Sequence, residues 1–597
     1  MKAIILAAGY GNRMRPLTDN EHKTLMKVAN STIIDRIIEA LLANNVKEII
    51  VALGYRSAEL QQYLVRRYGD LCELSFVLNE RYRETNNIHT LALVFESCDI
   101  DDDFILIESD LIFEDAVIER LIRSPHATVA LVDRYRSGMD GTVVKLDGGR
   151  VINVIPPHLQ GRDFEFSDKF KTLNIYKFSR EFCQRDFKKI LTYYARTIDD
   201  NCYYELILGL LIYMHRENIY AENVEGLSWA EVDDPNDLRL AEFQFNPSAR
   251  QGMLDSAWGG FWSYPITDFA FIRNMYFPPA SALSEVKNNL FELMANYGSC
   301  QKILNEKLGY FTLLPAENVV LLNGAAQAFP ILKQWLAGKR AVIPRPSFGE
   351  YARMFPQSQY YTDSGDQYAG SFIEACQWSD VDVVVVVNPN NPTGSLVSSK
   401  AVLDQIQGHP EKFFIVDESF IDFSGEESLE TLAPPNLDNF VVVKSLSKVL
   451  GVPGVRLGYV FTHHRSLHRY FMENLPVWNM NSIAEFLLEI LLKHRNAFKA
   501  SIAGTIRDRE EFAALLRQCP AVAAVFPSSA NFLMVRLACD ADSLSALLRK
   551  LLDEYRMYVK SGSEKFGDGA GYLRVAVRLP AENAELVDAL TQVWVGR

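Results

Sequence analysis

Residues 439–461 read NFVVVKSLSKVLGVPGVRLGYVF and hold the strongest structural signal in the chain. Two apolar runs flank a polar segment in which Lys448 is surrounded by serines and glycines. Short runs rich in Val, bounded by Gly and Pro, are typical of strands in the core of a sheet. The stretch therefore predicts a strand, a tightly built loop that carries the lysine, and a second strand.

The same rhythm extends in both directions through the second half of the chain. Further apolar runs are NVVLLNG (318–324), RAVIPRP (340–346), VDVVVVVNPN (381–390) and KFFIVDESF (412–420), separated by amphipathic stretches. An uninterrupted run such as VDVVVVV indicates a strand that is covered on both faces. From about Asn474 the pattern becomes helical and then mixed, which predicts a smaller C-terminal lobe.

The first half has its own α/β pattern, with KAIILAA (2–8), TIIDRIIEALLANN (32–45), KEIIVALGY (47–55) and DFILIESD (103–110). Strand-length runs that alternate with helical ones predict a mostly parallel, Rossmann-like sheet between helices. The pattern breaks between residues 243 and 268, which are rich in Gly, Pro, Ser and aromatic residues. We therefore predict two domains, 1–243 and 244–597.

Composition limits the classes of partner and compartment. The net charge of −14 over 597 residues argues against a nucleic-acid groove, which needs a basic stripe. Eight scattered cysteines form no CxxC pair, a pattern typical of thiols in a reducing compartment. No run has the length of a membrane span and the N-terminus lacks the features of a signal peptide. We expect a soluble cytoplasmic protein that binds neither nucleic acid nor membrane.

The N-terminal strand runs into Gly9 and Gly11, followed by Arg13 and Lys23. Glycines after a strand let backbone N–H groups approach phosphate oxygens, and the two basic residues add positive charge. Alone, a GxG sequence is usually a tight turn. The longer string LAAGYGNRMRPLT (6–18), with Lys23, resembles the sugar-nucleotidyltransferase superfamily. NERYRETNNIHTL (79–91) and WAEVDDPNDL (229–238) narrow the resemblance to its phosphocholine cytidylyltransferase-like branch.

This resemblance implies an Mg²⁺-dependent reaction with CTP. Asp110 and Asp233 are the implied metal ligands, with Glu231 and Asp234 as less certain neighbours. Lys23 and Arg13 would stabilise the departing pyrophosphate. The implied substrate-binding residues are Gly9, Gly11, Arg13, Lys23, Asn87 and Lys145, and Tyr204 and Glu205 are further candidates for the acceptor pocket. A surface lysine and an ordinary helical glutamate are the alternative interpretations of Lys145 and Glu205.

In the second half, SLSKVLGVPGVRLGY (445–459) resembles the fold-type I, pyridoxal-phosphate (PLP) dependent enzymes of the class I/II aminotransferase family. The resemblance makes Lys448 the lysine that forms a Schiff base with PLP. It places Ser445, Arg456 and the backbone amides of Ala325 and Ala326 at the cofactor phosphate. It also implies a homodimer, because fold-type I active sites usually lie between two subunits.

The remaining motifs of that family follow in order along the chain. Asn391 in NPNNPTG would bind the phenolic oxygen of PLP, and Asp417 in IVDESF would keep the pyridine nitrogen protonated. Phe348 in RPSFGEY matches the aromatic residue that stacks on the ring, with Tyr351 as the alternative. Arg574 in YLRVAVR matches the arginine that receives a substrate carboxylate.

One position departs from the pattern of many aminotransferases. Phe420 stands where those enzymes have Tyr, and DESFIDF (417–423) resembles the threonine-phosphate decarboxylase branch, which is close to the histidinol-phosphate aminotransferases. Both transamination and decarboxylation therefore stay open. Relatives of this kind act on substrates that carry a phosphate group.

The two halves together resemble the bifunctional cytidylyltransferase–transaminases of bacterial phosphonate pathways. The resemblance implies amination of phosphonoacetaldehyde by an amino-acid donor to give 2-aminoethylphosphonate, which then attacks CTP to give CMP-2-aminoethylphosphonate and pyrophosphate. The alternative is a phospho-amino-acid decarboxylase that feeds a phosphoethanolamine or phosphocholine cytidylyltransferase. A third reading, a non-catalytic sensor, is disfavoured because Lys448, Asp417, Asp110 and Asp233 are all present.

Overall fold

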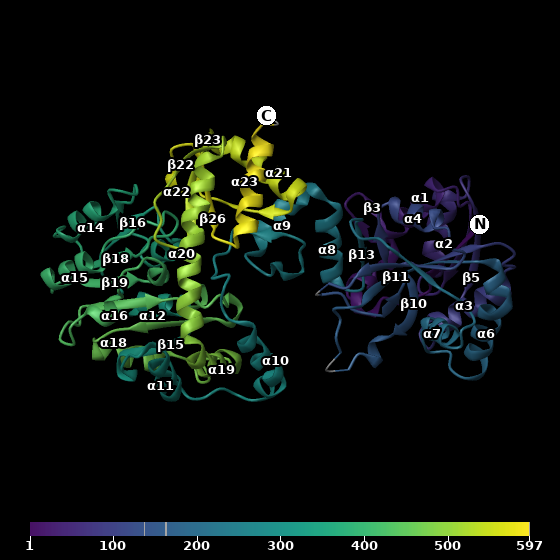
Figure 1. The fold of residues 1–597 in the computed structure, drawn as a ribbon, viewed down its shortest axis with the longest axis horizontal. Coiled ribbons are helices and arrows are strands. Elements are labelled where there is room, and N and C mark those ends of the chain that lie inside the picture. Colours follow the sequence, from purple (N-terminus) through teal and green to yellow (C-terminus); the bar gives the residue numbers. More distant parts are fainter. Residues whose placement is uncertain (137, 162–163, 596–597) are drawn as a thin grey trace. The chain divides into compact units, whose positions relative to one another are not determined.

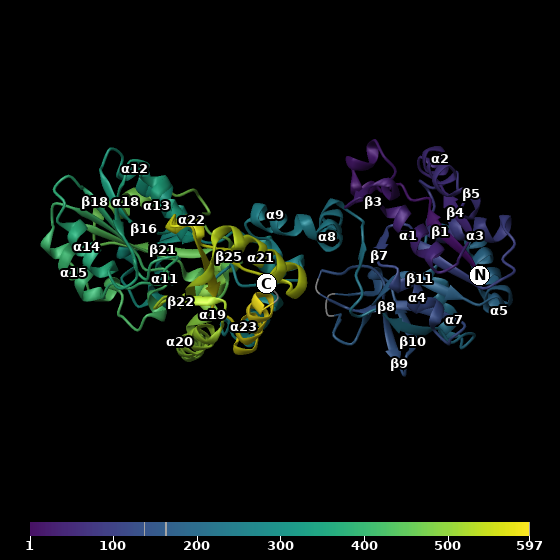
Figure 2. The same cartoon turned by 90° about the horizontal axis from the view of Figure 1, so that it is seen from above.

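The computed structural model describes residues 1–136, 138–161 and 164–595, and divides the chain into two compact units, Met1–Pro265 and Ile266–Arg597. Each unit contains its own sheet and its own hydrophobic core (Figures 1 and 2). The predicted fold class is confirmed: both units are α/β, and the second carries a small C-terminal lobe.

The N-terminal unit is built on a nine-stranded sheet in the order β5-β4-β1-β6-β11-β8-β12-β10-β9. Strands β5, β4, β1 and β6 are parallel, and β11 pairs antiparallel with β6. The strands are β1 (Lys2–Ala7), β4 (Glu48–Leu53), β5 (Glu73–Leu78), β6 (Phe104–Glu108), β8 (Val129–Arg134), β9 (Val143–Asp147), β10 (Arg150–Ile155), β11 (Phe170–Phe178) and β12 (Tyr220–Asn223). Beside this sheet, β7 (Leu111–Phe113) and β13 (Trp229–Glu231) form an antiparallel pair.

Helices cover both faces of this sheet, because the side chains of β1 alternate between two cores. Ala3, Ile5 and Ala7 pack with one set of helices, whereas Ile4 and Leu6 pack with the other. The first set is α1 (Ile33–Ala43), α2 (Ser57–Tyr68) and α4 (Ala116–Arg123), and the second is α3 (Asn87–Ser97), α6 (Lys188–Thr197) and α7 (Glu205–Tyr213). The polar ends of the parallel strands are thereby left at one edge of the sheet, where ligands of α/β proteins bind.

The C-terminal unit has a seven-stranded sheet in the order β15-β21-β20-β19-β18-β16-β17, in which β21 alone runs antiparallel to its neighbours. Its strands are β15 (Val319–Asn323), β16 (Ala341–Arg345), β17 (Gln359–Thr362), β18 (Val383–Val387), β19 (Phe413–Asp417), β20 (Phe440–Lys444) and β21 (Leu457–Phe461). The valines of β18 divide between two cores, 383, 385 and 387 on one face and 384 and 386 on the other. The run VDVVVVV is thus a strand covered on both faces, as predicted.

The helices of the large lobe flank this sheet. They are α10 (Ala280–Ala295), α11 (Gln301–Thr312), α12 (Ala328–Trp335), α13 (Gly349–Met354), α14 (Tyr368–Cys376), α15 (Ser399–Gly408), α16 (Leu429–Leu432), α17 (Leu446–Val449), α18 (Arg465–Asn474) and α19 (Ser482–Leu491). The long helix α20 (Arg495–Gln518) leads to the small lobe and is prominent in Figure 1.

The small lobe is a four-stranded antiparallel sheet packed against helices. Its strands follow the order β22-β23-β26-β25, and their side chains share one core with α20, α21 and α23. The elements are β22 (Val522–Val525), β23 (Phe532–Asp540), α21 (Ala541–Tyr555), β25 (Lys560–Ser561), α22 (Ser563–Phe566), β26 (Ala570–Ala576) and α23 (Pro580–Val595). Before this lobe in sequence, β14 (Thr267–Asp268) pairs with β24 (Met557–Tyr558).

The division between the units lies after Pro265, whereas the sequence placed it after residue 243. The segment in question folds back on α8 (Pro235–Phe245) through α9 (Pro247–Ala257). Arg250 is buried and donates hydrogen bonds to the carbonyl oxygens of Phe243 and Gln244, each at 2.8 Å. The ring of Tyr264 packs edge-on against Phe243 at 4.7 Å. These contacts attach a Gly- and aromatic-rich segment, which looks like a linker in sequence, to the first unit.

Within the described ranges, no helix is both long and apolar enough to span a membrane.

Candidate active sites

The first glycine loop begins where β1 ends. Gly11 adopts a left-handed backbone (φ 62°), and a Cβ atom there would stand 3.0 Å from Cγ2 of Thr18. The Thr18 hydroxyl donates a 3.0 Å hydrogen bond to the Gly11 carbonyl, which fixes the turn. Gly11 therefore meets both a conformational and a steric requirement, and the turn leads directly into the short helix that carries Arg13.

Two cations and two carboxylates predicted from distant motifs come together beside this loop. Lys23 Nζ lies 2.9 Å from Asp233 Oδ1 and 3.1 Å from Asp110 Oδ2, and Arg13 Nη2 lies 2.7 Å from Asp233 Oδ2. Burial by itself would lower the pKa of Lys23, but Asp110 and Asp233 outweigh it and the pKa is raised. Lys23 is therefore charged at neutral pH and holds the two carboxylates together.

The residues fit the predicted Mg²⁺. Asp110 Oδ1 is buried and has no hydrogen-bond partner in the described part of the chain, so one hard oxygen is available for a cation. No cluster of three or more His, Cys, Asp or Glu ligands occurs among the described residues. An ion at Asp110 and Asp233 would therefore complete its coordination with water and triphosphate oxygens, as Mg²⁺ commonly does.

Next to Asp110 lies a group of three carboxyl side chains, which we call the carboxyl pocket: the buried Glu205 and the half-buried Glu108 and Glu231. Asn87 Nδ2 donates to Glu108 Oε1 at 3.0 Å, and Lys171 Nζ pairs with Glu231 Oε2 at 3.0 Å. Burial raises the pKa of each of the three, that of Glu231 to about 7. Repulsion from Glu205 adds to the rise for Glu108, and repulsion from Asp110 and Asp233 adds to the rise for Glu231. Asn87 and the uncertain candidates Glu205 and Glu231 thus share one location.

Two members of this region were missed from the sequence. Glu108 stands two residues before Asp110 at the end of a strand, a signal that was available. Lys171 lies in β11, whose sequence FKTLNIYKF mixes polar and apolar residues, and nothing in this context marks it. Conversely, Lys145 lies on β9 with a half-exposed side chain 3.7 Å from Asp168, and no contact joins it to the Lys23 cluster. Lys171 is only 2% exposed and pairs with Glu231, so it is the lysine that is buried in this region.

A cavity of about 220 Å³ lies between the glycine loop and the carboxylate of Asp110. Its lining includes Gly9, Gly11, Lys23, Asn87, Glu108 and Asp110. It opens at the carboxyl ends of β1 and β6, the edge at which open α/β sheets bind ligands. The predicted glycine loop, Lys23, the predicted metal ligand Asp110 and Asn87 therefore border one space.

In the second unit, the predicted cofactor residues gather at the carboxyl ends of β18, β19 and β20. Asp417 ends β19 and is buried, and its Oδ2 accepts a 2.9 Å hydrogen bond from the Tyr351 hydroxyl. Asn391 Oδ1 accepts a hydrogen bond from Arg574 Nη1 at 2.9 Å. This contact does not use the Asn391 side-chain NH₂ group. The Tyr351 ring is fully buried, whereas Phe348 is 37% exposed. Phe348, the first choice for the stacking residue, is thus the more accessible of the two.

Lys448 lies in α17, just after β20, and its environment favours the neutral amine. Burial lowers its pKa to about 8, and the positive charges of Arg574 and Arg456 contribute to the shift. A neutral lysine is the nucleophilic form that bonds to an aldehyde. Arg574 is itself half-buried, and its Nε, which is buried, has no partner within the described residues. That unmet donor suits an anionic substrate group.

The predicted phosphate site is closely packed. A Cβ on Gly324 would stand 2.6 Å from Arg456 Nη2, and one on Gly458 would stand 2.3 Å from the backbone nitrogen of Ala325. Ser445 precedes α17, and its backbone N–H donates to Ser419 Oγ at 3.2 Å. Neighbouring turns thus carry the donors predicted for the phosphate: the amides of Ala325 and Ala326, Ser445 and the Arg456 guanidinium. This donor set fits a phosphate group.

Comparisons with known proteins agree with this two-site architecture. Residues 2–138 match the family described as nucleotidyl transferase, and residues 273–590 match the aminotransferase class I and II family. The chain is 32% identical over its whole length to CMP-5'-(3-aminopropyl)phosphonate synthase of Streptomyces rubellomurinus, covering 95% of that protein. It is also 30% identical, over 52% of its length and 82% of the relative, to L-serine phosphate decarboxylase of Sulfurospirillum multivorans.

Among solved structures, L-threonine-O-3-phosphate decarboxylase from Porphyromonas gingivalis superposes with a TM-score of 0.50 at 25% identity. The match covers 56% of this chain and all of that one. The likeness coincides with the second unit, in which Lys448, Asp417 and Asn391 converge. The protein is therefore an enzyme with two catalytic domains, and it belongs to the class I and II aminotransferase family in a form fused to an N-terminal nucleotidyltransferase.

Proposed function

We propose that the chain makes a cytidylylated aminophosphonate in two steps. The C-terminal half aminates phosphonoacetaldehyde to 2-aminoethylphosphonate, with an amino acid as donor, and the N-terminal half transfers CMP from CTP to that product, releasing pyrophosphate. The observation that carries the proposal is the convergence of Arg13, Lys23, Asp110 and Asp233 in a chain similar along its whole length to a CMP-aminophosphonate synthase.

In the N-terminal half, a phosphonate oxygen attacks the α-phosphorus of CTP as the bond between the α- and β-phosphates breaks. The attacking oxygen is already anionic, so no general base is required. Gly9 and Gly11 leave room for the triphosphate, and Lys23 and Arg13 stabilise the negative charge that moves onto pyrophosphate. An Mg²⁺ ion held by Asp110 and Asp233 would supply additional neutralisation of the phosphates.

In the C-terminal half, bound PLP supplies an electron sink for the bonds of the substrate carbon. Asp417 would hold the proton on the pyridine nitrogen, and Asn391 would orient the ring through its amide. Arg574 would bind the anionic end of the substrate through its unpartnered Nε. Lys448, with a pKa of about 8, can both accept and return a proton at Nζ near neutral pH. By resemblance to fold-type I enzymes, we propose that this half works as a homodimer.

Decarboxylation is a second candidate for the C-terminal half, and specific observations favour it. Position 420 is Phe, which has no hydroxyl to offer the cofactor. Its ring is buried and packs edge-on against Phe532 at 5.1 Å. Relatives that share this half include decarboxylases of L-serine phosphate and L-threonine phosphate. In that case an amino acid that carries a phosphate or phosphonate group would lose CO₂ and give a primary amine that keeps this group.

The first experiment measures pyrophosphate release from CTP and Mg²⁺. The competing acceptors are 2-aminoethylphosphonate, 3-aminopropylphosphonate, phosphoethanolamine and phosphocholine. We expect 2-aminoethylphosphonate to be preferred. Preference for 3-aminopropylphosphonate would keep the phosphonate class and change the chain length. Preference for either phosphate ester would overturn the phosphonate assignment.

A second experiment separates the two reactions of the C-terminal half. The full-length holoenzyme is given phosphonoacetaldehyde and an amino-acid donor, or O-phosphoserine alone. Consumption of the donor without CO₂ release supports amination, and CO₂ release without a keto-acid product establishes decarboxylation.

A further inference from the structure

The proposed CMP transfer assigns no role to the carboxyl pocket. Glu205, the first residue of α7, is only 4% exposed, and its Oε2 is buried with no hydrogen-bond partner in the described structure. The hydroxyl of the neighbouring Tyr204 is also buried without a partner there. Unpaired buried acceptors are costly, and native proteins seldom keep them without a ligand or water to satisfy them.

Asn87 connects this pocket to the reacting groups. Its Nδ2 donates to Glu108 Oε1 at 3.0 Å, and its Oδ1 accepts the backbone N–H of Tyr204 at 2.9 Å. Asn87 and Glu108 also line the cavity that contains Lys23 and Asp110. The first turn of α7 is therefore fixed beside the cavity in which CMP transfer is proposed.

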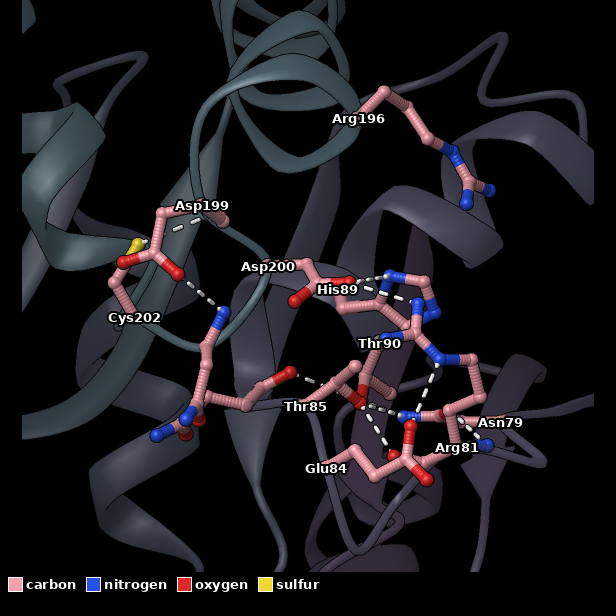
Figure 3. Close-up of polar contacts among 12 residues, drawn as sticks. Asn79, Arg81, Glu84, Thr85, His89, Thr90, Arg196, Asp199, Asp200 and Cys202 are labelled. Atoms are coloured by element: carbon pink, nitrogen blue, oxygen red, sulfur yellow. Dashed lines mark hydrogen bonds and ion pairs between the residues drawn. The ribbon is translucent and has the colours of Figure 1, made fainter.

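The loops that precede α3 and α7 are joined by polar contacts, and Figure 3 shows Arg81 of the first loop and Asp200 of the second. Arg81 Nη1 lies 2.8 Å from a carboxylate oxygen of Asp200, and the backbone N–H of Asn86 donates to the Asp200 carbonyl at 3.0 Å. On the other side, Asn79 Nδ2 donates to the hydroxyls of Thr85 and Thr90 at 3.1 and 3.0 Å. These contacts join the two loops that lead into α3 and α7, the helices that begin with Asn87 and Glu205.

The cations around the cavity already have carboxylate partners. Five carboxyl groups, Glu108, Glu205, Glu231, Asp110 and Asp233, are accompanied by three cations, Arg13, Lys23 and Lys171. Each of those cations already pairs with Asp110, Asp233 or Glu231. Among the described residues, no basic side chain hydrogen-bonds Glu108 or Glu205. Glu205 Oε2 is thus a buried acceptor for which the described residues supply no donor, and a ligand with N–H groups would satisfy it.

We propose that Glu205 and Glu108, oriented by Asn87, bind the ammonium group of the acceptor. The inference rests on the proposed function, in which the acceptor is a small amine-bearing phosphonate. A primary ammonium group has N–H donors for the buried Glu205 oxygen, whereas a trimethylammonium group has none. The pocket therefore selects primary amines over choline-type acceptors and orients the phosphonate toward Asp110.

The test compares amine-bearing and amine-free acceptors in the full-length protein. KM values for 2-aminoethylphosphonate and ethylphosphonate are measured at saturating CTP and Mg²⁺ for the parent, Glu205→Gln and Glu205→Asp. The matched control is Glu73→Gln, an exposed residue of β5. We expect Glu205→Gln to raise the KM for 2-aminoethylphosphonate about tenfold or more, because a charged hydrogen bond is lost. The KM for ethylphosphonate and for CTP should be unchanged, and the control should match the parent.

Two outcomes would overturn the proposal: an unchanged KM for 2-aminoethylphosphonate in Glu205→Gln, or an equal rise for the amine-free acceptor. An unchanged KM for CTP shows that the variant is folded. If the parent uses no phosphonate, the proposed function fails on its own. The pocket is then judged by calorimetric binding of phosphoethanolamine against ethyl phosphate, and equal affinities would refute it.

Discussion

The Lys23 ammonium lies 2.9 Å from the carboxylate of Asp233, although the two residues are 210 positions apart in the chain. The same ammonium contacts Asp110 at 3.1 Å. It therefore stands between the two carboxylates predicted to bind Mg²⁺. Lys23, together with Arg13, offsets the charge of these two carboxylates. This arrangement leads to two separate predictions for the N-terminal site.

The first prediction concerns Lys23. Replacing it with Met removes the cation that stabilises departing pyrophosphate, and we expect kcat for pyrophosphate release to fall about 100- to 1000-fold. Asp110 and Asp233 would then repel each other, so added Mg²⁺ should raise the melting temperature of Lys23→Met more than that of the parent. Lys47→Met, at an exposed position, is the control. Parent-like kcat in Lys23→Met would exclude a catalytic role for this residue.

The second prediction concerns metal dependence. Asp110→Asn removes the charge beside the unpartnered oxygen, so the Mg²⁺ concentration for half-maximal activity should rise more than about tenfold. Asp115→Asn, an exposed residue at the start of α4, should leave it unchanged. The dependence is measured by titrating Mg²⁺ at fixed CTP. A lower kcat with the same half-saturating Mg²⁺ would show that Asp110 is not a metal ligand.

The third prediction concerns the pH dependence of PLP attachment to Lys448. Burial, with Arg574 and Arg456, lowers the lysine pKa to about 8, so the reactive neutral amine predominates above that pH. The rate at which the apoprotein gains the visible absorbance of bound PLP should rise with pH, with a midpoint near 8. Arg574→Met removes a positive charge that disfavours protonation, so the pKa and the midpoint should move upward. Arg536→Met, exposed on β23, should leave the midpoint unchanged.

A midpoint near 10.4, the ordinary value for lysine, would contradict this account of the Lys448 environment.

The fourth prediction concerns the domain boundary. A fragment of residues 1–265 should unfold at higher urea than one of residues 1–243, because the shorter fragment lacks the buried Arg250 and its bonds to Phe243 and Gln244. Hydrogen bonds from a charged group contribute about 1.5–3 kcal/mol. Arg250→Met in the longer fragment should reproduce much of the loss. Equal midpoints for both fragments would favour the boundary at 243.

Local sequence patterns predicted much of the fold and the strand ends at which several candidate site residues lie. The unbroken run Val383–Val387 predicted a strand covered on both faces, and it is one. Asp110 and Lys448 were placed at strand ends by the apolar runs that precede them. The boundary was placed 22 residues before the division found in the structure, because the Gly- and aromatic-rich composition of residues 243–268 resembles a linker. Its packing on α8 is a long-range property that composition does not encode.

The sequence by itself determined the two α/β units, their order, and the motif residues of both sites, because strand periodicity and motif spacing are local properties of the chain. The tertiary structure alone decided that Lys23 joins Asp110 to Asp233, that Lys171 is buried while Lys145 is exposed, and that Glu108 and Glu231 lie near the buried Glu205. Those facts depend on strand register and on which side chains lose water. Burial and pairing arise only when segments far apart in the chain come together.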